Sequence, residues 1–405
     1  MRIAEINMTA NGSTGKIMLQ IAQVARERGH DVRTYSAHLY TRHPKKLSDI
    51  DGHTYFGSQS DGTFHYVIGR LTGKNGMLSR GATKRLIKML QKQKIDILHL
   101  HNLHYFCINL PMLFRYVKDH NIRVIWTLHD CWAFTGHCPY FDIVNCGRWK
   151  SGCHSCPQYR SYPTTMFDDS VKMYRKKKEW FTGVRDMTLV TPSAWLAGLV
   201  KQSFLKDYPV EVIPNGIDLN VFKPTDGHFQ AKYGLEGKKI VLGVALGWGI
   251  RKGLDVFEKL AERLPDDYQI VLVGTDDQID AHLSGKILSI HRTDNQQELA
   301  KLYTAADVFV NPTREDNYPT VNMEAIACGT PVITFRTGGS PEMVGDVCGS
   351  VVEKEDIDGM EREILRICEE KIYTREECVT YAQCFDKANC FEKYVCLYDS
   401  SEEII

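Results

Sequence analysis

Short apolar runs alternate along the first half of the chain with segments whose apolar residues recur every three or four positions. Ile17, Ile21 and Val24 share one face of such a helix, and Gly29 closes it. Strands and helices in alternation are typical of a doubly wound parallel sheet. The predicted strands of this half are 2–7, 31–36, 96–101 and 123–128, and the predicted helices include one around Leu86 and Leu90 and another at 110–120.

The second half repeats the alternation, so the sequence predicts an α/β fold made of two Rossmann-like, doubly wound domains. We place the domains at 1–206 and 207–378, and we expect 379–405 to be a helical segment. Ligands of such sheets bind outside the carboxyl ends of the strands, and we expect the two edges to face a central cleft. Residues 40–80 show no clear period and are expected to form an irregular loop. The predicted strands of this half are 239–245, 269–273, 286–290, 308–311 and 331–334.

Composition favours a globular protein of the cytoplasm. The chain has 405 residues, of which 43% are hydrophobic and 25% charged, and no apolar run reaches the length of a membrane span. The first residues resemble a strand more than a signal peptide. Thirteen cysteines in such a chain suggest reduced thiols.

The net charge of zero hides two halves of opposite sign. Residues 1–205 carry 29 Lys and Arg against 14 Asp and Glu, or +15, and the remainder carries 21 against 36, or −15. The basic half suits a phosphorylated acceptor or an anionic membrane surface, and dispersed solvated charge is the alternative. The basic helix predicted at 171–181 either docks on a membrane or packs Trp180 and Phe181 inward. No nucleic-acid recognition pattern is present in the sequence.

The most informative segment is 311–332. A buried strand leads into a loop with Asp316 and Asn317, and a helix then begins near Thr320, carries Glu324 and ends at Gly329. A helix N-terminus after a parallel strand is an anion site, because its N–H groups and positive dipole end face the ligand. A carboxylate one turn inside that helix is suited to ribose hydroxyls.

Asp316 and Glu324, with seven residues between them, resemble the sugar-nucleotide signature of family 4 glycosyltransferases, although the family usually has Glu at the first position. The resemblance implies a two-domain GT-B fold whose final helix crosses back onto the first domain, the acceptor side. It implies retaining, metal-independent transfer from a UDP- or GDP-sugar to a saccharide or lipid-linked acceptor, as in bacterial capsule and exopolysaccharide pathways. Such an enzyme is expected to be cytoplasmic, with peripheral contact at the inner membrane surface. The donor contacts that it implies are Asn317, Thr320, Val321 and Glu324, with Asp316 at the sugar.

Further glycine-rich loops follow other predicted strands. Gly12 and Gly15 allow close approach of a diphosphate or sugar, although Ala10 and Ile17 rule out a P-loop. Lys252 matches the family's phosphate-binding Lys-Gly pair, and Arg251 is expected to replace the family's usual Arg, whose place Gly247 takes. The remaining family loop is Gly338-Gly339-Ser340-Pro341-Glu342, with its glycines at the donor and Ser340 expected as a helix N-cap.

Several histidines cluster around the predicted strand at 123–128. The resemblance places His129 beside the donor sugar, and Asp130 is expected to orient its imidazole or bind the acceptor. His99 and His101 share one face of the preceding strand, with His104 in the loop beyond. A metal site is one interpretation of these three; polar contact or packing is the other.

Cys138, Cys146, Cys153 and Cys156 crowd into the loop that follows His129. The last two have the two-residue spacing of a zinc knuckle, and four thiolates can close a tetrahedral structural zinc site. Free thiols or redox pairs are the alternative, because the spacing is not that of a double CxxC motif.

Taken together, these motifs predict a retaining glycosyltransferase with Lys252 and Arg251 at the leaving diphosphate, and Asp316 and His129 at the sugar. Two other functions stay open. One is a sugar-nucleotide epimerase of the same architecture, and the other is a nonenzymatic protein that binds a sugar nucleotide or zinc. Turnover of a labelled donor with and without acceptor distinguishes the three.

Overall fold

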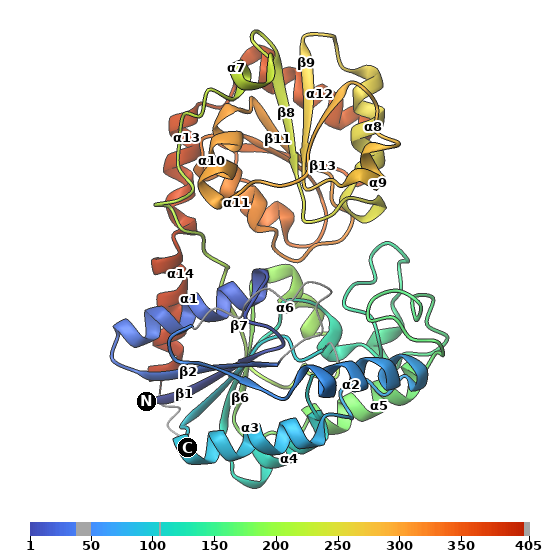
Figure 1. Ribbon diagram of the computed structural model, residues 1–405, viewed down its shortest axis with the longest axis vertical. Helices are drawn as coiled ribbons and strands as arrows, with labels where there is room; N and C mark the ends of the chain where they lie inside the picture. The colour runs from blue at the N-terminus through green and yellow to red at the C-terminus, as the bar shows by residue number, and fades with distance from the viewer. Residues whose placement is uncertain (38–49, 105–106, 401–405) are drawn as a thin grey trace. The chain divides into compact units, whose positions relative to one another are not determined.

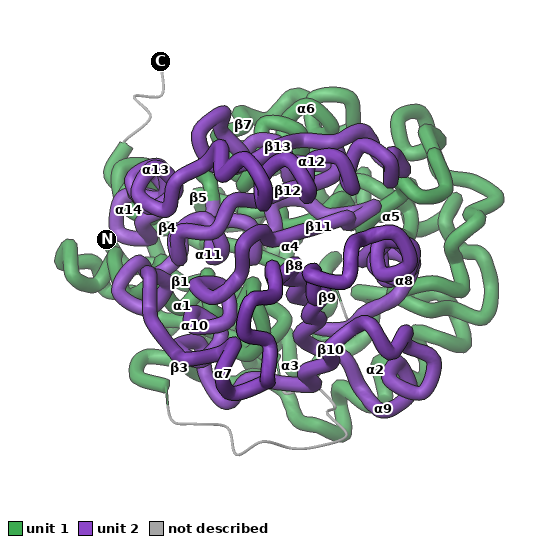
Figure 2. Tube along the Cα trace, turned by 90° about the horizontal axis from the view of Figure 1, so that it is seen from above, with its two compact units in different colours: residues 1–214, 391–405 green, residues 215–390 purple. Residues whose placement is uncertain are grey.

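A computed structural model describes residues 1–37, 50–104 and 107–400. The chain forms two compact units, Met1–Pro214 with Phe391–Ile405, and Asn215–Cys390 (Figure 2). The transitions therefore lie at 214/215 and 390/391, where the sequence suggested 206/207 and 378/379. The second transition falls inside helix α14 (Lys387–Asp399), so this helix begins in one unit and ends in the other.

The first unit is built on a seven-stranded parallel sheet in the order β3-β2-β1-β4-β5-β6-β7. The strand order reverses between β1 and β4, which is where doubly wound sheets bind their ligands. The loops after β1 and β4 therefore leave the sheet at this point. The strands are β1 (Arg2–Asn7), β2 (Asp31–Ala37), β3 (His53–Phe56), β4 (Ile97–Leu100), β5 (Arg123–Thr127), β6 (Met187–Thr191) and β7 (Val210–Val212).

Helices cover both faces of this sheet (Figure 1). On one face, Leu98 and Trp126 belong to an apolar core shared with α3, α4 and α5. The other face lies against α14, whose Tyr394 and Tyr398 contact polar side chains of β1, β4 and β5. The remaining helices of the unit are α1 (Ser13–Glu27), α2 (Gln59–Thr72), α3 (Arg80–Gln93), α4 (Leu110–Asp119), α5 (Ser170–Phe181) and α6 (Ala194–Val200).

The irregular loop predicted at 40–80 is wrong for its later part, because β3 and α2 form there; residues 40–49 lie outside the described residues. The Ser58 hydroxyl caps α2 by accepting from the Asp61 N–H, and Gly73 ends it with φ 69°. Two glycines within α2 favour a loop, although the spacing of Phe64, Val67 and Leu71 is helical.

The second unit repeats the plan with a six-stranded parallel sheet in the order β10-β9-β8-β11-β12-β13. Helices α8 and α12 share an apolar core with one face, and α10, α11 and α13 with the other. Here the order reverses between β8 and β11. The elements are β8 (Lys239–Val244), β9 (Tyr268–Val273), β10 (Ile287–Ile290), β11 (Val308–Asn311), β12 (Val332–Phe335), β13 (Gly349–Val352), α7 (Phe229–Tyr233), α8 (Leu254–Arg263), α9 (Asp277–Asp280), α10 (Gln296–Ala305), α11 (Thr320–Ala327), α12 (Ile357–Glu370) and α13 (Arg375–Tyr381).

Two doubly wound parallel sheets confirm the α/β class that the alternating pattern predicted. Across 1–37, 50–104 and 107–400, no helix is both long enough and apolar enough to cross a membrane.

Candidate functional site

The loops after β8 and β11 are joined at the switch point of the second sheet. The Arg314 N–H donates to the Arg251 carbonyl at 2.9 Å, and the Arg251 side chain donates back to the Glu315 carbonyl at 3.1 Å. Arg251 and Lys252 end a short 3-10 turn, Ile250–Lys252. The basic pair and the Asp316 loop, far apart in sequence, therefore form one surface.

Lys252 and Asp316 form an ion pair at the centre of this surface. The Lys252 ammonium lies 2.5 Å from the Asp316 Oδ2, and each side chain is 18% exposed. The second carboxylate oxygen of Asp316 accepts from the Asn317 N–H at 2.9 Å. Lys252, expected at the phosphates, and Asp316, expected at the sugar, are thus direct neighbours, and both side chains remain partly exposed to solvent.

Gly338, next to this pair, is required by the protein's own loops. A Cβ at Gly338, where φ is 55°, would lie 1.8 Å from the Asp316 carbonyl oxygen, and the Gly339 N–H donates to the Asn317 carbonyl at 2.9 Å. The loop after β12 is therefore fastened to the Asp316 loop. The prediction of Ser340 as N-cap is wrong, because Gly339 occupies that position and Ser340 begins a 3-10 turn.

Helix α11 begins beside the same loop. Pro319 is its N-cap residue, and no side chain caps the first turn, which contains Thr320 and Val321. Glu324, one turn inside the helix, is half-buried and accepts from the Tyr303 hydroxyl at 3.1 Å. The buried tyrosine thus orients a carboxylate that remains partly exposed.

Arg314 fixes the loop after β11 in this position, a role that the sequence analysis did not predict. It is 7% exposed and pairs with both oxygens of Asp255, at 2.7 and 2.8 Å, and of Glu355, at 2.5 and 2.8 Å. The hydrogen bonds raise the pKa of Arg314 and lower the pKa of both carboxyl groups. The partners lie on separate segments, so no local motif marks the residue. Bidentate pairs of this kind fix geometry strongly.

The glycines in the loop after β1 also have a structural role within the first unit. Gly12 has φ 86° and is the N-cap residue of α1, and a Cβ at Gly15 would lie 2.5 Å from the Ala10 carbonyl carbon. Asn7, which sequence reasoning missed, donates to the Thr9 carbonyl at 2.8 Å and accepts from the Asn102 N–H at 3.0 Å. This one side chain therefore connects the loops after β1 and β4 at the switch point.

His129 lies in the loop just after β5 and against His101. Its Nε2 is 3.1 Å from the His101 Nδ1, and the two rings stack at 5.4 Å with 13° between their planes. Burial lowers the pKa of His129 to about 3, so the imidazole is neutral at physiological pH. Asp130 does not orient it as expected: its carboxylate contacts the His104 Nε2 at 3.0 Å and the Trp132 N–H at 2.8 Å.

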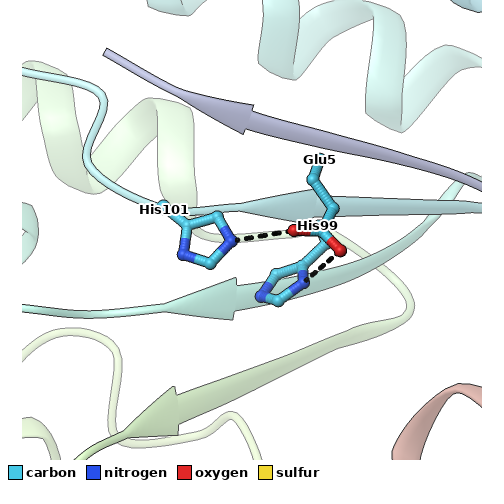
Figure 3. A group of neighbouring side chains, drawn as sticks. All are labelled: Glu5, His99 and His101. Carbon is cyan, nitrogen blue, oxygen red and sulfur yellow. Dashed lines mark ion pairs between the residues drawn. The ribbon is translucent and has the colours of Figure 1, made fainter. Parts of the chain in front are cut away.

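The three histidines of the loop and strand before β5 do not form a group. His99 and His101 share a face, as predicted, and both are buried, whereas His104 pairs with Asp130 and with the Tyr162 hydroxyl. Among the described residues, one group of three side chains of metal-binding type has donor atoms that all lie within 4.8 Å of one another. Its members are Glu5, His99 and His101 (Figure 3).

The four clustered cysteines line one small cavity together with Phe141 and Trp149. A hydrogen bond from the Cys138 thiol lowers the pKa of Cys156 to about 7, and the Gly136 N–H donates to the Cys153 sulfur at 3.1 Å. Over the residues described, their sulfurs do not form a group of three within 4.8 Å. The thiols are thus gathered but not closed into a tetrahedron, and zinc stays a prediction.

Helix α5 packs its aromatic tip inward. Trp180 is 6% exposed and Phe181 fully buried, which decides against membrane docking through these two residues. The Lys177 ammonium is also buried and donates to the Trp132 carbonyl at 2.7 Å and the Thr135 carbonyl at 3.1 Å. Helix α5 therefore fastens the loop that leads from His129 to the cysteines.

Comparison with known proteins identifies the family. Residues 14–221 match the model of Glycosyltransferase Family 4, and residues 239–370 match that of glycosyl transferases group 1. A protein of Escherichia coli K12 named for glycosyl transfer in colanic acid biosynthesis is 25% identical over 268 residues, which span 64% of this chain and 65% of that protein. A D-inositol 3-phosphate glycosyltransferase of Mycobacteroides abscessus is 28% identical over 151 residues, 34% of each chain.

Solved structures agree on the architecture. Anabaena HepE in complex with UDP and glucose matches with a TM-score of 0.69 at 14% identity, over 99% of this chain and 100% of that one. The two parallel-sheet units thus have the GT-B fold. With more than half of its residues matched by the first family model, the chain belongs to glycosyltransferase family 4.

Proposed function

We propose that the protein is a retaining glycosyltransferase of bacterial surface polysaccharide biosynthesis, of the capsule or exopolysaccharide type. It moves a hexose from a nucleoside-diphosphate sugar to a saccharide or lipid-linked saccharide. The observation that carries this proposal is the Lys252–Asp316 pair beside the uncapped start of α11, at the switch point of the second sheet. The name of the colanic acid relative supports the pathway class.

The donor occupies the second unit in this proposal. Lys252 and Arg251 bind the diphosphate together with the first N–H groups of α11, at Thr320 and Val321. Glu324 accepts hydrogen bonds from the ribose hydroxyls. The sugar contacts are Asp316, Asn317 and the backbone at Gly338 and Gly339.

The chemistry follows from the charges placed around the diphosphate. As the bond between the anomeric carbon and the phosphate oxygen breaks, negative charge grows on the leaving group, and Lys252 and Arg251 stabilise it. The acceptor hydroxyl attacks from the same face and gives its proton to the leaving phosphate oxygen, so the configuration is retained. Side chains supply the counter-charge in this scheme, which makes the reaction metal-independent.

The first unit serves the acceptor. From the family resemblance we propose that His129 takes part in binding the donor sugar, and that the loop with Gly12 and Gly15 takes part in binding the acceptor and the donor phosphates. We place this reaction in the cytoplasm, where nucleotide sugars are the activated donors that the family uses.

Glu324→Gln is expected to weaken binding of the nucleoside diphosphate by roughly 1.5–3 kcal/mol, the scale of a charge-assisted hydrogen bond. The amide keeps the volume and one oxygen but loses the charge that the ribose hydroxyls bind. Titration calorimetry with UDP and with GDP measures the change. Glu370→Gln, at the exposed end of α12, is the matched control. An unchanged affinity in Glu324→Gln removes this residue from the donor site.

We also propose that Cys138, Cys146, Cys153 and Cys156 hold a structural zinc ion. Their convergence on one cavity supports it, as does the Gly136 N–H that donates to the Cys153 sulfur, since thiolate ligands of zinc attract such donors. A redox pair between Cys138 and Cys156, whose thiols are hydrogen-bonded, is the competing proposal.

Peripheral contact with an anionic membrane is proposed through α2 and the loop before α5. Phe64 (60% exposed), Val67 and Leu71 form an apolar stripe on α2, and Phe167 is 65% exposed. The Met166 N–H donates to the Arg70 carbonyl at 2.9 Å, which places the loop against this helix. The lysines that surround the Asp169 carboxylate beside this stripe are Lys74, Lys172 and Lys176. Apolar residues bordered by ammonium groups complement an anionic bilayer.

The double change Phe64→Ser and Phe167→Ser is expected to weaken binding to phosphatidylglycerol vesicles at least about tenfold, because two large apolar groups no longer enter the interface. Sedimentation with vesicles measures it, with pure phosphatidylcholine vesicles as the uncharged reference. Val347→Ser, an exposed apolar residue of the second unit, is the control. Equal sedimentation of the double variant and the unmodified protein contradicts this surface.

A further inference from the structure

A polar cluster lies inside the first unit, beneath α14. Glu5 on β1 is the register partner of His99 on β4, and His101 follows two residues later on the same face (Figure 3). Glu5 and His99 are 0% exposed and His101 is 1% exposed. Buried polar groups are costly unless they are hydrogen-bonded, so such a cluster requires an explanation.

Two atoms of this cluster lack a partner among the described residues: the Glu5 Oε2 and the His101 Nε2. They lie 3.5 Å apart and face each other, as the dashed line of Figure 3 marks. One proton shared along this line provides both with the interaction that they lack. Desolvation raises the pKa of Glu5 to about 8 and lowers that of His101 to about 3, so the proton is carried by the carboxyl group at neutral pH.

The other nitrogen of His101 extends the connection to His129. With the Glu5 proton directed at the His101 Nε2, His101 must carry its own proton on Nδ1. It then donates to the His129 Nε2 at 3.1 Å, and the proton of neutral His129 is left on Nδ1. Ionised Glu5 would instead accept from the His101 Nε2 and reverse both tautomers.

His99 is occupied differently. Its Nδ1 lies 2.7 Å from the Tyr398 hydroxyl, and its Nε2 lies 2.9 Å from the Thr127 hydroxyl. A metal ion held by Glu5, His99 and His101 would have to displace Tyr398 from His99. A shared proton leaves that contact intact, so the hydrogen-bond pattern favours the proton.

The groups that face Glu5 come from α14, α1, β4 and the loop after β4. Tyr398 of α14 lies 3.3 Å from its Oε1, and the Arg26 guanidinium of α1 lowers the pKa of Glu5 but does not offset the burial. His99 of β4 and His101 of the loop after it are neutral, since burial lowers the pKa of both.

We propose that Glu5 and His101 are positioning residues that fix the ring orientation and the tautomer of His129. The proposal rests on the proposed function, in which His129 contacts the donor sugar. Positioning of this kind matters because small displacements of a contact group change rates by up to about 100-fold.

The test compares Glu5→Gln with Glu5→Leu by histidine nitrogen NMR and by steady-state kinetics. A glutamine amide still donates to the His101 Nε2, so Glu5→Gln is expected to keep the His129 proton on Nδ1 from pH 6 to 9. The unmodified protein is expected to lose this tautomer as pH rises through about 8. Glu5→Leu, which cannot donate, is expected to give mixed tautomers and roughly a 10–100-fold lower kcat with little change in donor KM. Glu179→Gln on the exposed face of α5 is the control.

The pH dependence of the unfolding equilibrium gives a second readout that does not require enzyme activity. The pKa of Glu5 is raised in the folded state, so its stabilising effect is full below the unfolded value of 4.5 and is lost as pH rises towards 8. Between pH 6.5 and 8 the unfolding equilibrium constant is expected to rise by up to about tenfold per pH unit from this group. Glu5→Gln is expected to remove that slope.

Identical His129 spectra in Glu5→Leu and the unmodified protein would overturn the proposal. So would a metal ion, found by elemental analysis, that Glu5→Gln releases. Changed tautomers with unchanged kcat would refute the positioning role while leaving the glycosyltransferase assignment intact. If the tautomers shift as expected but no nucleotide sugar is turned over, the hydrogen-bond chain stands and the proposed function fails.

Discussion

Lys252→Ala is expected to lower kcat by roughly 10²–10³-fold, the usual cost of removing one group that stabilises charge in a transition state. The ammonium is the partner of Asp316 at 2.5 Å and lies at the switch point of the second sheet. Its loss leaves the departing diphosphate without a counter-charge and leaves the Asp316 carboxylate without its partner. Both effects act on the donor sugar and its leaving group. Kinetics with a radiolabelled donor measure the loss.

Two comparisons make this prediction specific. Lys259→Ala removes the same group from the exposed side of α8 and is expected to leave turnover unchanged. In Lys252→Ala, calorimetry should show a larger loss of affinity for the nucleoside diphosphate than for the monophosphate. Equal losses for the two nucleotides would mean that the lysine does not touch the terminal phosphate.

Replacing Cys153 and Cys156 with Ser is expected to release about one zinc ion per chain and to expose the 136–160 loop to proteolysis. Four cysteines lie within this loop around one cavity, and the loop contains only a short 3-10 turn, Arg148–Lys150. Metal binding contributes roughly 10–16 kcal/mol in small zinc modules, so its loss would disorder the ligand loop. Elemental analysis of protein purified without chelator, followed by limited proteolysis, measures both effects.

The control is Cys396→Ser, an exposed cysteine on α14, which should keep the metal and the protease resistance. Donor affinity should persist in the double variant, because the donor site is proposed in the second unit. Metal-free protein with full activity and a resistant loop would refute zinc. A Cys138–Cys156 disulfide found by mass spectrometry in that protein would establish the redox pair instead.

Local pattern predicted those parts of the fold and site that depend on neighbours in sequence. Helix α11, from Thr320 to Ala327, lies within the predicted segment, because a buried strand, a polar loop and a closing glycine all occur in one continuous stretch. The alternation of apolar runs likewise predicted both sheets, since strands of a parallel sheet are buried on both faces. The adjacency of Lys252 and Asp316 followed from both loops leaving carboxyl ends of parallel strands.

Contacts between distant segments could not be predicted in this way. Arg314 is fixed by Asp255 and Glu355, which share no motif with it, and Glu5 meets His101 only because β1 and β4 are neighbours in the sheet. Asp130 lies next to His129 in sequence, yet its carboxylate is hydrogen-bonded to His104, which lies in another loop. In each case the partner is chosen by tertiary packing.

Helix α2 was missed for a different reason. Its two glycines suggest a loop when the sequence is considered alone, because glycine is a poor helix former, even though Phe64, Val67 and Leu71 recur at helical spacing. The structure adds that this apolar stripe is exposed, which is what makes it informative about a partner.

The most direct test of the central claim is nucleoside diphosphate release from labelled UDP- and GDP-sugars, with and without a saccharide or lipid-linked acceptor. We expect release with one of these donors to depend on an acceptor and to produce a new glycosidic bond that keeps the donor's anomeric configuration. Conversion of the donor to an epimer without acceptor would contradict the account in favour of an epimerase. Tight binding of a sugar nucleotide with no turnover under any acceptor would identify a binding protein instead.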